Sequence, residues 1–441
     1  MTKQWEFLQP KLYTQRREAF IALLATLIWF IAILVRHHLP EAGDWTLSES
    51  LLEAFSFVVF AAVPIFGLAT QWGDRLATHL LLPNQGLRFQ LTLCTALAVF
   101  ISLAKRLNLS PRHFDWINQF NTLVIPGQFW LNVALFLGGI FVGLRIPFVV
   151  QELRQKPQPY LRWQLYGLLL LNTLYLSLHR TASPWEGFIV SIVYGVICIG
   201  LTGSRSRDIS PRKQLIPSDF WLMVLCVAIL YWFSIPSFSF GVFMGVDLFI
   251  LVMVYGSGLG REHFGYSFAT RPQDWPVLGV LIFAVLILLV PLAVGSGFVQ
   301  PALVQSQFSP LKLGVYFVLF TFRVAIFEEV FFRSGVMVLL RDCLSGGRKI
   351  HPLRSPQITL WLSALGCSLL FGLSHIGNAP GANALSLWQY RGLYIVLASS
   401  ASMFYAIAFA KTNRLAIPIL VHGFVDTTAV VLLGGSLAVP F

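Results

Sequence analysis

Residues 276–298 read PVLGVLIFAVLILLVPLAVGSGF, with no charged side chain in the run. A helix needs about 20 apolar residues to cross the hydrocarbon core of a bilayer, so this stretch predicts a transmembrane span. Comparable runs recur along the chain and predict an all-α fold, a polytopic transmembrane helical bundle of about thirteen spans. The candidate spans are 19–35, 51–69, 89–104, 126–149, 164–178, 186–202, 219–235, 239–255, 276–298, 311–332, 358–376, 391–410 and 415–434.

The composition of the whole chain supports the same conclusion. Of its 441 residues, 56% are hydrophobic and 11% are charged, whereas charged side chains make up roughly a quarter of a soluble domain. The mean hydropathy is +0.72. Such a sequence cannot cover itself with polar surface, so we expect the lipid bilayer to be its solvent.

The net charge of +12 has a particular distribution. Basic residues lie in short loops between apolar runs, which is typical of the positive-inside pattern and not of a nucleic-acid-binding surface. The amino-terminal segment, residues 1–18, is basic, whereas the loop that follows the first span carries Glu41 and Asp44. We therefore expect an integral, multi-pass protein with a cytoplasmic amino terminus and no nucleic-acid partner. The basic residues of 105–112 are an exception, since the span count leaves them outside.

A polar stretch at 256–275 separates two regions of the chain. It predicts an amino-terminal multi-span membrane region, residues 1–270, whose role the sequence does not reveal. Every pattern with a chemical signature falls in the second region, residues 275–435.

The first of these patterns is FEEVFFR, residues 327–333, within an apolar helix. Two adjacent carboxylates are costly inside a bilayer and persist when they are paired, protonated or in contact with water. Glu329 and Arg333 are four residues apart, so they share a helix face and can form an ion pair. Glu328 is rotated by about 100° and can point elsewhere. The spacing indicates one carboxylate that is held in place and one that is free to act as a general base. A salt-bridged helix end is the alternative interpretation.

Two histidine patterns follow on later apolar runs. His375 ends the sequence FGLSH, where a packed or capping histidine is the common case. In HGFVD, residues 422–426, the four-residue spacing places Asp426 on the same helix face as His422. A carboxylate that accepts one ring N–H fixes the tautomer and leaves the other nitrogen available. A glutamate, a histidine and a histidine–aspartate pair on separate helices could hold and activate a water molecule.

The order EExxxR, FxxxH and HxxxD over residues 275–435 resembles the family of intramembrane proteases that includes CAAX prenyl endopeptidases, lysostaphin-resistance proteins and bacteriocin-processing enzymes. The resemblance implies a CAAX-protease-like helical domain with a polar cavity between its helices. By position, Glu328 would activate the hydrolytic water and Glu329 with Arg333 would support it. His375 and His422 would bind the water, a metal or the developing oxyanion. Many members have Asn where this chain has Asp426; an aspartate there strengthens His422 as a metal ligand and weakens any role of the position as an oxyanion donor.

The resemblance leaves the cofactor open. The family is often described as metalloproteases, and Glu328, His375 and His422 are an acceptable ligand set for a divalent metal such as zinc. A water activated by Glu328 and held by the two histidines needs no metal.

The leading functional interpretation is an intramembrane endopeptidase acting on a membrane-anchored or prenyl-like peptide. A proton-coupled transporter is an alternative, because about thirteen spans is a transporter-like number. However, the polar residues cluster in the last spans, with no matching set in the first half. A proteolytically inactive scaffold or immunity protein is the third interpretation.

Overall fold

The computed structural model describes residues 8–37, 46–58, 62–80, 125–155, 159–179, 260–299, 310–346, 356–376 and 386–433, with a few residues between 94 and 105. Within these ranges all regular secondary structure is helical, as predicted. In the part of the chain that the structure describes, four helices are long and apolar enough to cross a membrane: Arg17–Arg36, Asp274–Gly295, Pro356–Ser374 and Leu387–Thr412. The count of thirteen spans is not confirmed. The candidate spans 186–202, 219–235 and 239–255, with most of 89–104, lie outside the described residues.

The described chain falls into two compact units. In the second unit, α7 (Phe129–Gln155) packs against α8 (Pro159–His179). The first unit combines residues 1–74 with 259–441 and holds every candidate site residue. Its amino-terminal helices are α1 (Leu8–His37), α2 (Leu47–Phe57) and α3 (Val63–Leu68), followed by the first turn of α4 (Gln71–Leu80). The predicted boundary between 270 and 275 stays a prediction.

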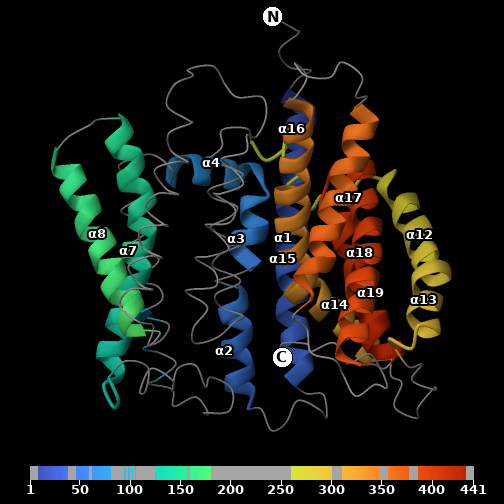
Figure 1. The fold of residues 1–441 in the computed structure, drawn as a ribbon, viewed down its shortest axis with the longest axis horizontal. Helices are drawn as coiled ribbons and strands as arrows, with labels where there is room; N and C mark the ends of the chain where they lie inside the picture. Colours follow the sequence, from blue (N-terminus) through green and yellow to red (C-terminus); the bar gives the residue numbers. More distant parts are fainter. Residues whose placement is uncertain are drawn as a thin grey trace, which may run out of the picture. The chain divides into compact units, whose positions relative to one another are not determined.

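The carboxy-terminal part of the first unit is a bundle of antiparallel helices (Figure 1). Its α-helices are α12 (Asp274–Ala284), α13 (Val290–Gly295), α14 (Pro310–Phe320), α15 (Ile326–Glu329), α16 (Val338–Gly346), α17 (Pro356–Ser374), α18 (Leu387–Thr412) and α19 (Ala416–Thr427). Four π-helical segments continue them: η3 (Val285–Leu289), η4 (Thr321–Ala325), η5 (Val330–Met337) and η7 (Thr428–Leu432). Helix α18 packs against both α17 and α19, and α19 also contacts η4.

Local sequence signals set the ends of α18. Ser386 and Gln389 form a capping box, in which each side chain bonds the other's backbone N–H, so that two unpaired donors of the first turn are satisfied. Asn413 ends the helix in the left-handed conformation, with φ of 49°, which asparagine tolerates better than most residues. The chain therefore turns sharply into α19 and directs it back along α18.

The helix that carries the FEEVFFR sequence, residues 310–346, is unusual because π-helical turns lie on both sides of α15. Such turns are rare in proteins, and those that occur are often found at functional sites. Here η4 lies against α19 at a very close approach, since a Cβ on Gly423 would meet Thr321 Oγ1. The glycine next to His422 thus lets α19 contact the helix that carries the glutamates.

Ion pairs connect the amino-terminal helices to this bundle. Glu53 of α2 accepts a hydrogen bond from Arg323 of η4 at 2.7 Å. At the other end of α1, Arg261 donates to Glu18 at 2.9 Å and to Asp74 at 2.9 Å. Burial lowers the pKa of Arg261, but its hydrogen bonds and charge interactions with the two carboxylates outweigh burial and keep that pKa above its ordinary value. The first unit is therefore held together across both ends of α1.

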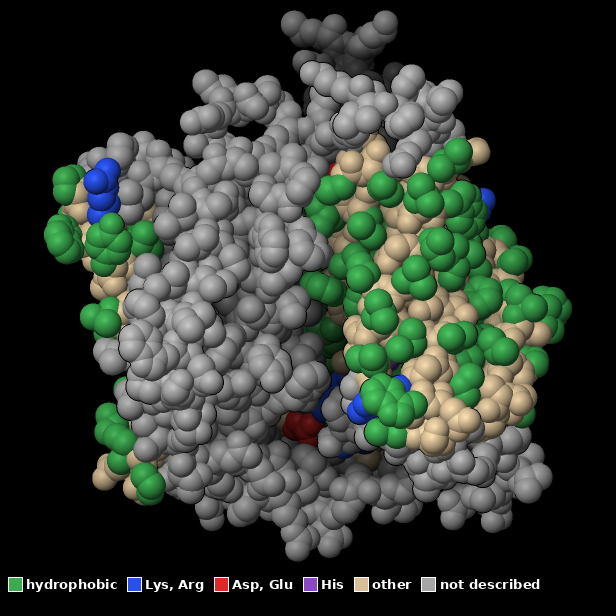
Figure 2. All heavy atoms as spheres, in the orientation of Figure 1, with side chains coloured by type: hydrophobic (Ala, Val, Ile, Leu, Met, Phe, Trp, Pro, Cys, Tyr) green, Lys and Arg blue, Asp and Glu red, His purple; other side chains and the backbone are tan. Residues whose placement is uncertain are grey.

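The outer surface of the bundle is apolar. Figure 2 shows hydrophobic side chains gathered over the region that Figure 1 assigns to α12, α17 and α18. Exposed residues there include Phe283, Leu288, Trp361 and Leu369. Contiguous exposed apolar surface of this kind is the lipid-facing surface of a membrane protein. With its spanning helices, it makes the chain an integral membrane protein.

Candidate active site

The predicted ion pair between Glu329 and Arg333 is present and entirely buried. Arg333 Nε donates to Glu329 Oε2 at 2.8 Å, and both side chains are 0% exposed. The rest of the guanidinium is also engaged: it contacts Cys367 Sγ of α17 at 3.0 Å and donates to Ser402 Oγ of α18 at 2.8 Å. Since a buried charge is tolerated only when it is paired and hydrogen-bonded, these contacts explain how Glu329 stays inside the bundle.

His422 of α19 lies between three carboxylates. Its Nδ1 is 2.9 Å from Glu329 Oε1, and an ionised carboxylate can only accept, so Nδ1 carries the proton. Its Nε2 is 3.4 Å from Asp426 Oδ2 and 3.7 Å from Glu328 Oε2. The sequence pattern predicted Asp426 as the acid that orients the ring. In the structure that part falls to Glu329, and Asp426 lies at the other nitrogen together with Glu328.

The two adjacent glutamates differ in exposure, as the 100° rotation predicted. The side chain of Glu328 is 31% exposed, whereas that of Glu329 is 0% exposed. Glu328 Oε2 is shielded from bulk solvent, and within the described ranges it makes no hydrogen bond. At 3.7 Å from His422 Nε2 the two groups are beyond direct hydrogen-bond distance, a spacing at which a bridging water is to be considered. Glu328 is therefore the carboxylate available to hold a water.

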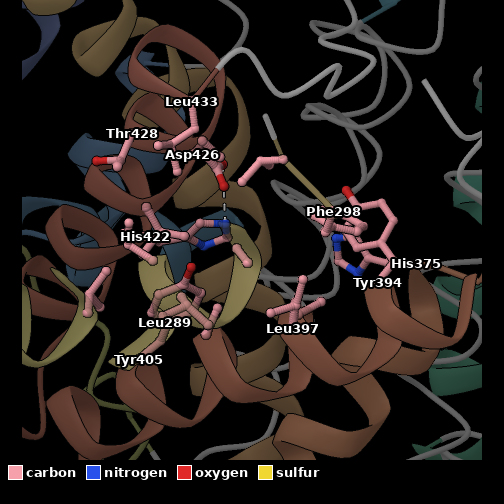
Figure 3. Close-up of a pocket in the computed structure, with 18 of the residues that line it drawn as sticks. Leu289, Phe298, His375, Tyr394, Leu397, Tyr405, His422, Asp426, Thr428 and Leu433 are labelled. Carbon is pink, nitrogen blue, oxygen red and sulfur yellow. Dashed lines mark ion pairs between the residues drawn. The ribbon is translucent and has the colours of Figure 1, made fainter. Parts of the chain in front are cut away.

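A cavity of about 100 Å³ is lined by His422 and Asp426, the residues next to Glu328. Figure 3 shows His422 with Asp426 on one side of it and His375 with Tyr394 and Phe298 on the other. The histidine that ends FGLSH and the histidine of HGFVD, which fall at different depths of their apolar runs, thus line the same cavity. The remaining lining is mostly aliphatic and aromatic, including Leu289, Leu397 and Val425.

His375 is also held in one tautomer. Its Nδ1 lies 2.8 Å from the carbonyl oxygen of Phe371, and because a carbonyl only accepts, Nδ1 donates and Nε2 is left as an acceptor. The ring packs against Phe371 and Tyr394 at centroid distances of 4.8 and 5.2 Å. This geometry favours a histidine that accepts a hydrogen bond from a group in the cavity.

The donor arrangement does not favour the predicted metal set. Among the described residues, no group of three His, Cys, Asp or Glu side chains is arranged to hold a metal ion. Glu328 and His422 are neighbours, but His375 lies on the opposite side of the cavity from His422. The zinc site stays a prediction, and the chemistry proposed below uses no step through a metal.

Several residues at this site were not predicted from the sequence. Tyr405 stacks on the His422 ring at a centroid distance of 4.4 Å and 12° between planes. Ser402 and Cys367 satisfy Arg333. Polarity gave a partial signal, because Ser402 is a hydroxyl residue in the apolar run of α18. The stacking tyrosine carried none, since aromatic residues are common throughout the chain.

The comparisons with known proteins address the same part of the chain. Residues 310–428 match the family model described as type II CAAX prenyl endopeptidase Rce1-like. No curated protein and no solved structure matches the chain. The matched segment runs from the start of α14 to the end of α19 and contains all three motifs. It confirms, for residues 310–428, the resemblance drawn from those motifs.

Proposed function

We propose that the chain is an intramembrane endopeptidase that hydrolyses a peptide bond of a membrane-associated substrate. One observation carries the proposal: within the segment that matches the family, Glu328 Oε2 lies 3.7 Å from Nε2 of His422, and His422 lines an apolar cavity in the bundle. A free carboxylate, an oriented imidazole and a shielded cavity are the components that a water-activating site requires.

In the proposed reaction, Glu328 and His422 hold a water molecule between them. Glu328 takes a proton from this water as its oxygen bonds the carbonyl carbon of the scissile peptide. The same proton passes to the leaving nitrogen as the carbon–nitrogen bond breaks, so that Glu328 returns to its starting form. Glu329 and Arg333 do not contact substrate in this scheme. They fix the ring of His422, which contributes by orientation.

His375 contributes from the opposite wall of the cavity. Its Nε2 is the free acceptor of the ring and could receive a hydrogen bond from the peptide N–H or from the water. Asp426 lies 3.4 Å from His422 Nε2, where its charge would favour an imidazolium during charge build-up. We therefore include His375 and Asp426 in the proposed site.

The substrate class follows from the cavity and the family. An aliphatic and aromatic lining next to a hydrolytic group suits a peptide that carries a lipid or is anchored by an apolar segment. The matching family is described as type II CAAX prenyl endopeptidase, which favours a substrate that carries a prenyl group. A membrane-anchored or prenyl-like peptide is the substrate that we propose for this chain.

The transporter alternative is not favoured by these observations. Carboxylates and histidines in a spanning bundle could relay protons, but the match is to a peptidase family. The cavity is also lined by His375 and His422, which belong to two of the three motifs of that family. A proteolytically inactive relative would share the geometry and is distinguished only by assay.

The test is cleavage of a panel of membrane-anchored peptides, with and without a prenyl group, by the full-length protein purified in detergent. Wild type is compared with His422→Ala and with Glu262→Gln, an exposed acidic residue far from the cavity in sequence, as matched control. We expect wild type and Glu262→Gln to yield the same products and His422→Ala to yield none. Equal product from all three proteins would overturn the proposal.

A further inference from the structure

The catalytic cavity lies toward one end of the helical bundle. It is lined from the last part of α13 by Ala293, from the end of α17 by His375, from the first half of α18 by Tyr394, and beyond η7 by Leu433. Helix α18 begins at the end of the bundle where α17 and α19 finish, so these positions share one end. We call it the cavity end (Figures 1 and 3). The segments that join or follow the helices there are 297–309, 375–386 and 433–441, and none contains Lys or Arg.

The opposite end, which we call the basic end, carries most of the positive charge of this unit. Helix α1 starts there, because Glu18 of its amino-terminal part pairs with Arg261, shortly before α12. The turn between α18 and α19 lies at the same end, where α16 ends and α17 begins. Its basic residues within the described ranges are Lys11, Arg16, Arg17, Arg261, Arg271, Arg341, Lys411 and Arg414. The sequence between α16 and α17 adds Arg348, Lys349 and Arg354.

Three basic residues near the cavity end lie within helix termini and not in loops. Arg36 is 4.0 Å from Glu53. Lys312 and Arg391 lie over the rings of Tyr316 and Trp388, at 5.7 and 5.4 Å from the ring centroids. Basic and aromatic side chains together are typical of either membrane interface. These three therefore do not offset the difference between the loops of the two ends.

The positive-inside rule relates this asymmetry to the membrane, because loops rich in Lys and Arg stay on the cytoplasmic side. We propose that the catalytic cavity opens into the half of the bilayer that faces away from the cytoplasm. The substrate would then be a membrane-anchored peptide whose scissile bond lies near that face, such as an exported peptide, and not a cytoplasmic tail. The identity of the reaction rests on the proposed function, but the side of the cavity does not.

The side of the cavity can be measured without any activity. Single cysteines are introduced as Ile376→Cys, beside the cavity end, and as Lys411→Cys, at the basic end, both at exposed positions. Intact bacterial cells that express the full chain are treated with a membrane-impermeant maleimide, and the parent protein corrects for labelling of native cysteines. We expect Ile376→Cys to be labelled in intact cells and Lys411→Cys to be labelled only after permeabilisation.

The reverse pattern would overturn the proposal, as would equal labelling of both cysteines in intact cells. Should Ile376→Cys fail to fold, Ser386→Cys at the start of α18 reports on the same end. Retention of the size-exclusion profile of the parent protein verifies the fold of each variant.

Cleavage then tests whether the substrate is used from that side. One peptide sequence is fused to a membrane helix in both orientations, which presents it on the outer face or on the cytoplasmic face of the same cells. Cleavage of the outer peptide alone would support the proposal, and cleavage of the cytoplasmic peptide would overturn it. Cleavage of neither would count against the proposed function, and the labelling pattern would still decide on which side the cavity opens.

Discussion

Two clusters of buried charge in the same unit differ in what they leave unsatisfied. At the basic end, Arg261 donates to both oxygens of Glu18, to Asp74 and to a backbone carbonyl. Beside the cavity, Glu329, Arg333 and His422 are paired in the same manner, but Glu328 keeps a buried oxygen that has no hydrogen bond within the described ranges. Burial requires partners for a charge in both places. Under the proposed function, this unsatisfied oxygen beside His422 is what distinguishes the second cluster, as a reactive site, from the first, which contributes stability only.

The substitution with the largest expected effect on this difference between the two clusters is Glu328→Gln. The amide keeps the size of the side chain and cannot accept a proton from water, so we expect the cleavage rate to fall by about 10²–10⁴-fold. Because the side chain is 31% exposed, the thermal unfolding midpoint should stay near that of wild type. Both quantities are measured on the same detergent-purified sample. A variant that retained its rate would exclude Glu328 as the base.

Arg333→Met should have the opposite effect to Glu328→Gln. We expect it to lower the stability of the folded protein, whatever its effect on the cleavage rate. Removal of the guanidinium leaves Glu329 buried with an uncompensated charge, which costs about 3–5 kcal/mol. The control is Arg341→Met on α16, where the arginine is 29% exposed and the ion pair with Asp342 is longer, at 3.3 Å; such a pair contributes about 0–1 kcal/mol. Thermal unfolding and expression level report the difference.

A second variant keeps this test decisive. In Arg333→Met combined with Glu329→Gln both charges are gone, so part of the lost stability should return, although His422 is no longer oriented. If the double variant were no more stable than Arg333→Met alone, the pairing energy would not be what holds this part of the bundle together.

The comparison also shows which features follow from the sequence. The pairing of Glu329 with Arg333 and the proximity of His422 to Asp426 were predictable, because a four-residue spacing fixes neighbours on one helix face. The contact from Glu329 to His422 was not predictable. It joins side chains 93 residues apart and depends on the register of α19 against the glutamate helix, which local periodicity does not encode.

The division of the chain into units also depends on contacts between distant residues, which the sequence pattern does not predict. Hydropathy located the helices, and the polar stretch 256–275 suggested a boundary. The packing of α1 to α3 with the carboxy-terminal helices depends on pairs such as Arg261 with Glu18, which are 243 residues apart. No single-sequence pattern predicts which of many charged residues meet across that distance.

Arg261→Gln tests the outer cluster and should affect stability only. Glu18 would lose its bidentate partner, and a carboxylate that is 7% exposed would be left poorly paired, so we expect a loss of about 1–3 kcal/mol in the free energy of unfolding. The cleavage rate per folded molecule should be unchanged. A fall in that rate with stability intact would contradict the distinction between the two clusters.

Gly423→Ala probes the contact that brings His422 to the glutamates. The added methyl group would meet Thr321 Oγ1, and we expect a cost of about 1–3 kcal/mol from overpacking, together with a slower cleavage rate. Gly392→Ala is the matched control, because a Cβ there has no neighbour within 4 Å. That control should be neutral or stabilising by up to about 1 kcal/mol, since alanine favours the helix. Thermal unfolding compares the two variants directly.

The smallest expected effect is that of a metal chelator. Within the described ranges no three donor side chains are arranged around a metal. We therefore expect incubation with a strong chelator, followed by its removal, to leave the cleavage rate of wild type unchanged. Loss of cleavage that zinc restores would instead show that His375 approaches Glu328 and His422 as a ligand. In that case Glu329, which accepts the hydrogen bond from Nδ1, would act as the partner that increases the basicity of His422, as acidic partners of metal-bound histidines do, and Glu329→Gln should weaken zinc binding in an equilibrium dialysis measurement.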